Sequence, residues 1–193
     1  MSDPEPHSAL IRVTHWVNAL SFAALVVSGV AILLAHPRLY WGETGTFGTP
    51  SLVDLPLPLM LDGQAGWGRS LHFLSAWACM AAGAAYLTSG LRSGHMRREL
   101  LSTRGVHAYT RPQRLAYFAV VAVLVPSMAW TGLAMSPAMT SVAPFLATMV
   151  RGEQSARTIH FVVACALVLF CAGHVLMVAV SDFRARMRGM ITG

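Results

Sequence analysis

Four histidines lie inside stretches of the chain that are otherwise apolar: His15, His72, His160 and His174. An ionisable side chain is costly at membrane depth, so such a residue usually serves a function. One histidine alone could be a structural residue with a satisfied hydrogen bond, but four together, without Asp, Glu or Lys in the same stretches, favour ligand chemistry. The remaining four lie in tails or loops, where we expect solvated side chains: His7, His36, His95 and His107.

The order of the four histidines sorts them into two levels of the membrane. His15 begins the first apolar stretch and His72 begins the second, so consecutive antiparallel helices would place them near opposite surfaces. His160 and His174 are 14 residues apart. In a helix this spacing corresponds to about 21 Å of rise, with the two side chains within about 40° of each other. We therefore expect an outer pair of His72 with His160 and an inner pair of His15 with His174.

Two neutral imidazoles on neighbouring helices, with apolar walls and no carboxylate or thiolate, suit haem b. The porphyrin supplies four ligands to the iron, so the protein adds only the two axial ones. A structural zinc site usually needs four protein ligands, and a di-iron bundle needs glutamates, which these stretches lack. The two histidine pairs therefore predict two haem b groups, one iron bound by the inner pair and one by the outer pair.

An arginine precedes three of the histidines by three residues, at Arg12, Arg69 and Arg157. Residues three apart share a helix face, so each arginine would lie about one turn nearer the water than its histidine. A haem propionate at that level would accept two hydrogen bonds from a guanidinium. Arginines also anchor the ends of membrane helices, and this simpler explanation remains open for each of them.

Glycines at related positions would give a porphyrin room beside a helix. Gly29 follows His15 by 14 residues and Gly83 follows His72 by 11, so both are nearly in phase with those histidines. Each helix would then ligate one haem and make space for the other. Small residues also promote ordinary packing of membrane helices, so this signal is not specific.

Four apolar stretches would position these side chains: residues 13–35, 70–91, 114–135 and 158–180. About 20 apolar residues cross a bilayer as a helix, and backbone groups in lipid have no partners outside the helix. Apolar and polar residues do not alternate as in a transmembrane barrel. Pro126 lies inside the third stretch and is expected to kink it. The predicted fold is an all-α integral membrane four-helix bundle, with residues 1–193 forming a single domain.

Composition and charge place this bundle in a membrane. The chain is 55% hydrophobic and 11% charged, against about 25% charged in soluble domains, so its apolar surface must face lipid. If both termini are cytoplasmic, ten arginines lie on that side and four on the other, which agrees with the positive-inside rule. The basic stretch 92–114 could instead indicate nucleic-acid binding, but its place between two spans is explained by topology, and we expect no nucleic-acid partner.

Residues 36–69 would form a long loop on the outer side of the membrane, rich in glycine and proline, with Tyr40, Trp41 and Trp67. A connection of this length usually has a function. Its aromatic residues could form a belt at the membrane surface, or they could provide a docking platform for a partner outside the membrane.

Four segments of the chain resemble one family. RVTHW (12–16), GRSLHF (68–73), SARTIHF (155–161) and CAGHVLMV (171–178) look like the four-helix di-haem cytochrome b family. That family includes bacterial cytochrome b(561) and the membrane subunits of nickel-iron hydrogenases, formate dehydrogenases and thiosulfate reductases. The resemblance covers nearly the whole chain, and the histidine order with its 14-residue spacing is its specific part.

The resemblance implies the same ligand pairs in a protein of the bacterial inner membrane, and it implies which side of that membrane each haem faces. The inner haem would lie beside a quinone site on the cytoplasmic side, and the outer haem would exchange electrons with a periplasmic catalytic partner. The nearest polar candidates for quinone contacts are Arg12, Trp16 and Asn18. The loop segments 41–50 and 63–70 resemble the subgroup found with a periplasmic molybdopterin oxidoreductase.

Three functions remain open at this point. The first is an electron-transfer subunit, itself non-catalytic, between quinone and a periplasmic redox protein. The second is a stand-alone cytochrome b(561)-type quinone oxidoreductase, a homodimer acting on a small oxidant. The third is a metal transporter that uses the same histidines. Filling both axial positions of each iron suits electron transfer, and the long outer loop favours the first function.

Overall fold

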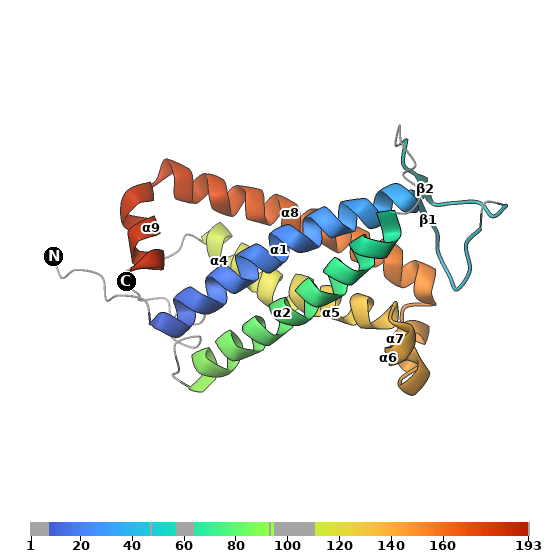
Figure 1. Ribbon diagram of the computed structural model, residues 1–193, viewed down its shortest axis with the longest axis horizontal. Helices are drawn as coiled ribbons and strands as arrows, with labels where there is room; N and C mark the ends of the chain where they lie inside the picture. The colour runs from blue at the N-terminus through green and yellow to red at the C-terminus, as the bar shows by residue number, and fades with distance from the viewer. Residues whose placement is uncertain (1–7, 47, 57–63, 93, 95–110, 193) are drawn as a thin grey trace. The chain divides into compact units, whose positions relative to one another are not determined.

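The computed structural model describes residues 8–46, 48–56, 64–92, 94 and 111–192, which are mostly helical (Figure 1). Among these described residues, four helical segments are long and apolar enough to cross a membrane, and they coincide with the predicted spans to within about five residues. The prediction of an all-α membrane protein with four spanning helices is confirmed. The cytoplasmic position of both termini stays a prediction. Several residues used for it, and three loop or tail histidines, lie outside the described residues: Arg97, Arg98, Arg104, His7, His95 and His107.

The spanning segments begin with α1 (Ala9–Ala35) and α2 (Gln64–Arg92). The third segment runs from α4 (Arg111–Ala119) through η1 (Val120–Leu124) to α5 (Val125–Ala134), and the fourth is α8 (Glu153–Val180). Short elements complete the described chain: β1 (Arg38–Leu39), β2 (Val53–Asp54), α6 (Pro137–Val142), α7 (Phe145–Thr148) and α9 (Phe183–Ile191).

Large apolar side chains remain exposed along the spanning helices. Leu20 of α1, Leu74 of α2 and Leu169 of α8 are 70%, 70% and 73% exposed. A soluble protein rarely leaves so much apolar surface in water, whereas lipid tails solvate it without cost. These side chains therefore face the hydrocarbon of the bilayer.

The third spanning segment contains a π-helical turn, η1, directly before Pro126. Proline lacks the N–H that would bond to the carbonyl four residues earlier, and its ring collides with that carbonyl in a regular α-helix. A turn with one additional residue widens the helix at this point. The irregularity expected at Pro126 thus takes the form of a π-helical turn.

Internal packing divides the chain into two units. The first unit comprises residues 1–32, 63–108 and 171–193, and so holds most of α1, all of α2, the end of α8 and α9. The second unit comprises residues 33–62 and 109–170, with both strands, the helices from α4 to α7 and the beginning of α8. The prediction that residues 1–193 form a single domain stays a prediction.

Short helices close the second unit around a small core of Ala134, Leu146 and Ala156. Trp130 on α5 stabilises this core, because its indole N–H donates a hydrogen bond to the Leu146 carbonyl at 3.1 Å. Its ring also meets Phe145 edge-on, with 6.2 Å between the ring centroids. The segment between α5 and α8 is thereby folded onto the end of α5.

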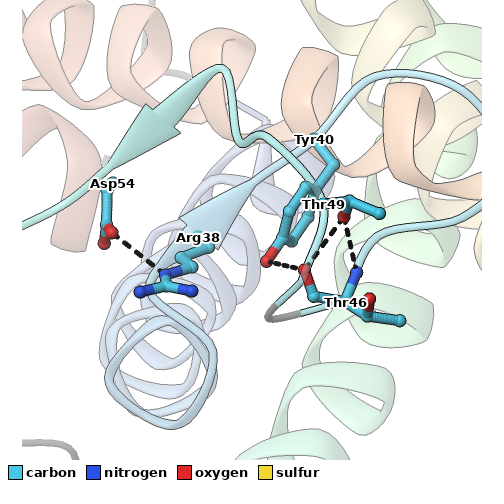
Figure 2. Close-up of polar contacts among 5 residues, drawn as sticks. All are labelled: Arg38, Tyr40, Thr46, Thr49 and Asp54. Atoms are coloured by element: carbon cyan, nitrogen blue, oxygen red, sulfur yellow. Dashed lines mark hydrogen bonds and ion pairs between the residues drawn. The ribbon is translucent and has the colours of Figure 1, made fainter.

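The described part of the loop after α1, residues 36–46 and 48–56, is also folded. Strands β1 and β2 pair antiparallel, and Arg38 forms an ion pair with Asp54 across them, with 3.0 Å between Nε and Oδ2 (Figure 2). The Tyr40 hydroxyl donates to the Thr46 carbonyl, and the Thr49 hydroxyl bonds both the carbonyl and the N–H of Thr46 (Figure 2). These contacts form a compact turn from a segment rich in glycine and proline.

This loop caps the beginning of α8 with backbone atoms. The Gly42 carbonyl accepts the N–H groups of Gln154 (3.1 Å) and Ser155 (3.2 Å), which have no partners inside the helix. In return, the Gly42 N–H donates to the Ser155 hydroxyl at 2.7 Å. The Thr158 hydroxyl donates to the Tyr40 carbonyl at 2.6 Å. We call the hydrogen bonds made by Gly42 and Tyr40 to α8 the loop–α8 contact.

Candidate functional site

Two of the predicted ligands lie together in the first unit. His15 on α1 and His174 near the end of α8 have ring centroids 6.4 Å apart, with their planes tilted by 58°. A metal–imidazole bond is about 2 Å long and the nitrogen lies about 1.1 Å from the ring centre, so two imidazoles on opposite sides of one metal have centroids about 6 Å apart. The spacing of these two rings therefore fits two axial ligands of one metal.

The donor set around this pair fits haem better than a bare metal ion. Within the described ranges, no three His, Cys, Asp or Glu side chains approach closely enough to hold a metal ion. The two imidazoles would need further donors, and a porphyrin brings four of its own. Gly83 on α2, in the same unit, offers room, because a Cβ built there would meet no atom within 4 Å.

His72 on α2 is held by α1, also in the first unit. Its Nδ1 lies 3.0 Å from the hydroxyl of Ser28, a side chain with no exposed surface. Gly29 follows on α1, and a Cβ built there would lie 3.6 Å from the Cε1 of His72. A Cβ at the glycine predicted to make room at the outer level would thus be in ordinary van der Waals contact with the His72 ring.

His160 on α8 has the same kind of neighbours in the second unit. Its Nδ1 lies 3.0 Å from the hydroxyl of Thr131 on α5, a side chain that is 2% exposed. Gly132 follows, and a Cβ built there would lie 3.6 Å from the Cε1 of His160. His72 and His160 belong to different units, so their pairing stays a prediction.

The three arginines predicted to bind propionates have different surroundings. Arg12 is half-buried on α1, and Arg69 is exposed near the start of α2. Arg157 is half-buried on α8 and donates a hydrogen bond to the carbonyl of His36. A guanidinium has five N–H donors, so this bond leaves further donors for an anion. The role of all three arginines at a propionate stays a prediction.

A shallow groove of about 340 Å³ lies next to the inner pair, in the first unit. Its walls come from α1 and α9 and include Arg12, Val13, Trp16, Leu20, Met190 and Ile191. The Trp16 indole N–H donates to the Met190 carbonyl at 3.0 Å, which holds α9 against α1 (Figure 1). The same indole meets the His15 ring edge-on, with centroids 5.6 Å apart. One aromatic side chain therefore connects the groove to the inner pair.

Sequence reasoning did not identify several of these neighbours. Ser28 and Thr131 were signalled only by a hydroxyl residue followed by glycine within a span. The α9 wall of the groove had no sequence signal beyond the basic, amphipathic end of the chain. Asn18, a candidate for quinone contact, does not line the groove, but its Oδ1 is buried without a hydrogen-bond partner in the part of the chain that the structure describes.

Comparison with known proteins decides the family. The family model described as prokaryotic cytochrome b561 matches residues 6–193, nearly the whole chain. The chain belongs to this family. It is therefore a multi-pass inner-membrane cytochrome b, a haem protein of electron transport, and the resemblance stated from its histidine segments is confirmed.

A curated relative points in the same direction. A protein of Azospira oryzae named as a putative protein-methionine-sulfoxide reductase subunit, YedZ1, is 30% identical in an alignment that covers 90% of the cytochrome and 89% of the relative. No solved structure matches the chain.

Proposed function

We propose that this cytochrome passes electrons between the quinone pool and a periplasmic oxidoreductase through two bis-histidine b haems. The observation that carries the proposal is the 6.4 Å spacing of the His15 and His174 rings, in a family of membrane haem proteins. Each haem, when bound, accepts and releases one electron. Two imidazoles from the protein on each iron would leave no position for a substrate and would favour electron transfer through the porphyrin edge.

The inner haem is ligated by His15 and His174. Both rings lie in one unit at a distance that suits one metal, and Gly83 leaves open space in that unit. The outer haem is ligated by His72 and His160, which lie near the beginnings of α2 and α8. This second pairing rests on the predicted membrane depth of the two residues.

Quinone occupies the groove between α1 and α9. The groove is mainly apolar, which suits a quinone ring and its tail, and Arg12 provides a donor for a quinone oxygen. Trp16 lines the groove and also contacts the His15 ring, with centroids 5.6 Å apart. An electron would therefore have a short path from a quinol in the groove to the inner haem.

The partner is a periplasmic enzyme that docks on the loop after α1. The loop is held to α8 by the loop–α8 contact and presents Trp41, which is 49% exposed. The name of the Azospira oryzae relative supports a reductase of oxidised methionine as the partner, with electrons flowing outward from quinol. The resemblance of the loop segments supports a molybdopterin cofactor in that enzyme.

Haem content tests the ligand assignment. His174→Ala and His160→Ala should each lower the haem content of the purified full-length protein from two per chain to one, because one axial ligand is lost in each case. His36→Gln is the matched control, a histidine that we assign to no haem, and should retain both. Spectra without b-type bands, or two haems remaining in His160→Ala, would contradict the proposal.

Purification from native membranes tests the partner. A stoichiometric periplasmic subunit that is reduced by quinol only in the presence of this cytochrome supports the proposed assembly. A homodimer that oxidises quinol with a small oxidant and carries no second subunit would instead indicate the stand-alone cytochrome b(561)-type enzyme.

A further inference from the structure

Two buried hydroxyl groups meet two histidines in the same way in separate parts of the molecule. The Ser28 hydroxyl lies 3.0 Å from Nδ1 of His72 in the first unit, and the Thr131 hydroxyl lies 3.0 Å from Nδ1 of His160 in the second. Neither contact involves neighbours in sequence, since 44 and 29 residues separate the partners. The repetition indicates a shared role for the hydroxyls.

The hydrogen-bond partners of the hydroxyls determine which atom carries the proton on each ring. The Ser28 hydroxyl donates its single hydrogen to the Ala24 carbonyl at 2.6 Å, and the Thr131 hydroxyl donates to the Ser127 carbonyl at 2.7 Å. When the hydroxyl hydrogen goes to this carbonyl, the oxygen is an acceptor at the imidazole and Nδ1 of the ring carries the hydrogen. In a neutral imidazole of this tautomer the lone pair is on Nε2.

The residue after each hydroxyl fixes the rotation of the ring. Gly29 and Gly132 place their Cα hydrogens against Cε1 of His72 and His160, and a Cβ at either position would be 3.6 Å from that atom. A side chain longer than alanine would extend into the imidazole. The hydroxyl and the glycine therefore lie along the Nδ1–Cε1 edge of each ring, and Nε2 is the next ring atom after Cε1.

We propose that Ser28 and Thr131 are positioning residues that hold His72 and His160 as Nδ1–H tautomers with Nε2 presented to haem iron. The inference rests on the proposed function, because it requires these histidines to be ligands. A ligating histidine that donates its other N–H to an acceptor is a stronger electron donor to the metal. Stronger donation stabilises ferric over ferrous iron, so both hydroxyls lower the reduction potential of the haem that their histidine binds.

Redox titration of the full-length protein tests the positioning role. Ser28→Ala removes the first acceptor, and Thr131→Val removes the second while keeping the volume of the side chain. At a fixed ambient potential, each variant should raise the ratio of ferrous to ferric haem several-fold for one haem only. A tenfold change would correspond to about 59 mV for this one-electron couple. The paramagnetic resonance spectrum of the same ferric haem should change as the ring loses its fixed orientation.

Two further variants separate this role from general packing. Thr131→Ser keeps the hydroxyl and should retain the original potential. Thr88→Ala removes a hydroxyl from α2 that bonds its own helix at the Ala84 carbonyl in the same manner, at 2.8 Å, and should leave both haems unchanged. Loss of a haem in Ser28→Ala or Thr131→Val, with two haems retained in Thr131→Ser and Thr88→Ala, would also support the positioning role. It would show that the histidine needs the hydroxyl to bind the haem.

Failure of this inference is distinguishable from failure of the proposed function. If His72→Ala and His160→Ala lose a haem but Ser28→Ala and Thr131→Val show the original potentials and spectra, the ligands stand and the positioning role is wrong. If His72→Ala and His160→Ala retain both haems, the outer ligand assignment is wrong, and the positioning role fails with it.

Discussion

Gly152→Ala should release the loop from the beginning of α8. Gly152 has a φ of +115°, a conformation that alanine rarely adopts. A Cβ at this position would lie 2.5 Å from the Gly42 carbonyl oxygen and 2.6 Å from the Cα of Glu43. Both are backbone atoms, so the collision cannot be relieved by a change of rotamer, and the loop must move away.

The size of the effect follows from the contacts that would be lost. Backbone strain at a position of this kind costs about 1–3 kcal/mol. The hydrogen bonds that Gly42 makes to Gln154 and Ser155 contribute roughly 1 kcal/mol each. We therefore expect the free energy that favours the loop bound to α8 over the open loop to fall by roughly 3 kcal/mol or more. Since about 1.4 kcal/mol changes an equilibrium constant tenfold, local opening should become on the order of 100-fold more frequent.

Hydrogen exchange measured by mass spectrometry detects this opening directly. The amides of Gln154 and Ser155 should exchange on the order of 100-fold faster in Gly152→Ala, because their acceptor is the Gly42 carbonyl. Gly48→Ala is the matched control, since a Cβ at Gly48 would meet nothing within 4 Å. Equal protection of these amides in both variants would refute the reasoning. Binding of the periplasmic partner should weaken in Gly152→Ala with haem content unchanged.

Three further predictions concern the groove, the porphyrin space and the surface. Trp16→Phe removes the donor to the Met190 carbonyl and should raise the KM for quinol several-fold, with both haems retained; an unchanged KM would argue against quinone in the groove. Gly83→Leu should expel the inner haem, because the leucine side chain would occupy the open space beside Gly83 that we assign to the porphyrin. Gly66→Leu on the same helix is the control and should retain two haems in a pyridine haemochrome assay. Asp54→Asn should change the unfolding free energy by no more than about 1 kcal/mol, since the Asp54 side chain is 54% exposed; a large shift in thermal unfolding would show that the strand pair depends on this ion pair.

The spanning helices could be predicted from the sequence because length and apolarity alone decide them in a membrane. The proximity of His15 and His174 could be anticipated because the predicted antiparallel spans place both at the same membrane depth, although their role as ligands stays a prediction. Contacts between backbone atoms could not be anticipated, since the Gly42 carbonyl that caps α8 leaves no mark in side-chain type.

Ser28 and Thr131 escaped sequence analysis for a different reason. Serine and threonine in membrane helices commonly bond the carbonyl four residues earlier, and this local bond is all that the sequence indicates. Whether the oxygen also meets a histidine depends on the rotation of one helix against its neighbour. That rotation is set by packing along the whole contact, which periodicity within a single helix does not encode.

The π-helical turn before Pro126 implies that loss of this proline and loss of one residue from the third spanning segment should occur together in evolution. A π-helical turn contains one residue more than an α-helical turn, so deleting one residue from Val120–Leu124 would restore a regular helix without rotating α5. The same deletion elsewhere in the segment would rotate everything beyond it by about 100°, moving Thr131 off its present face. A regular helix, however, would again collide with the proline ring. We therefore expect the two changes to occur together, and an alignment of family members should show that those without this proline have a third helix shorter by one residue.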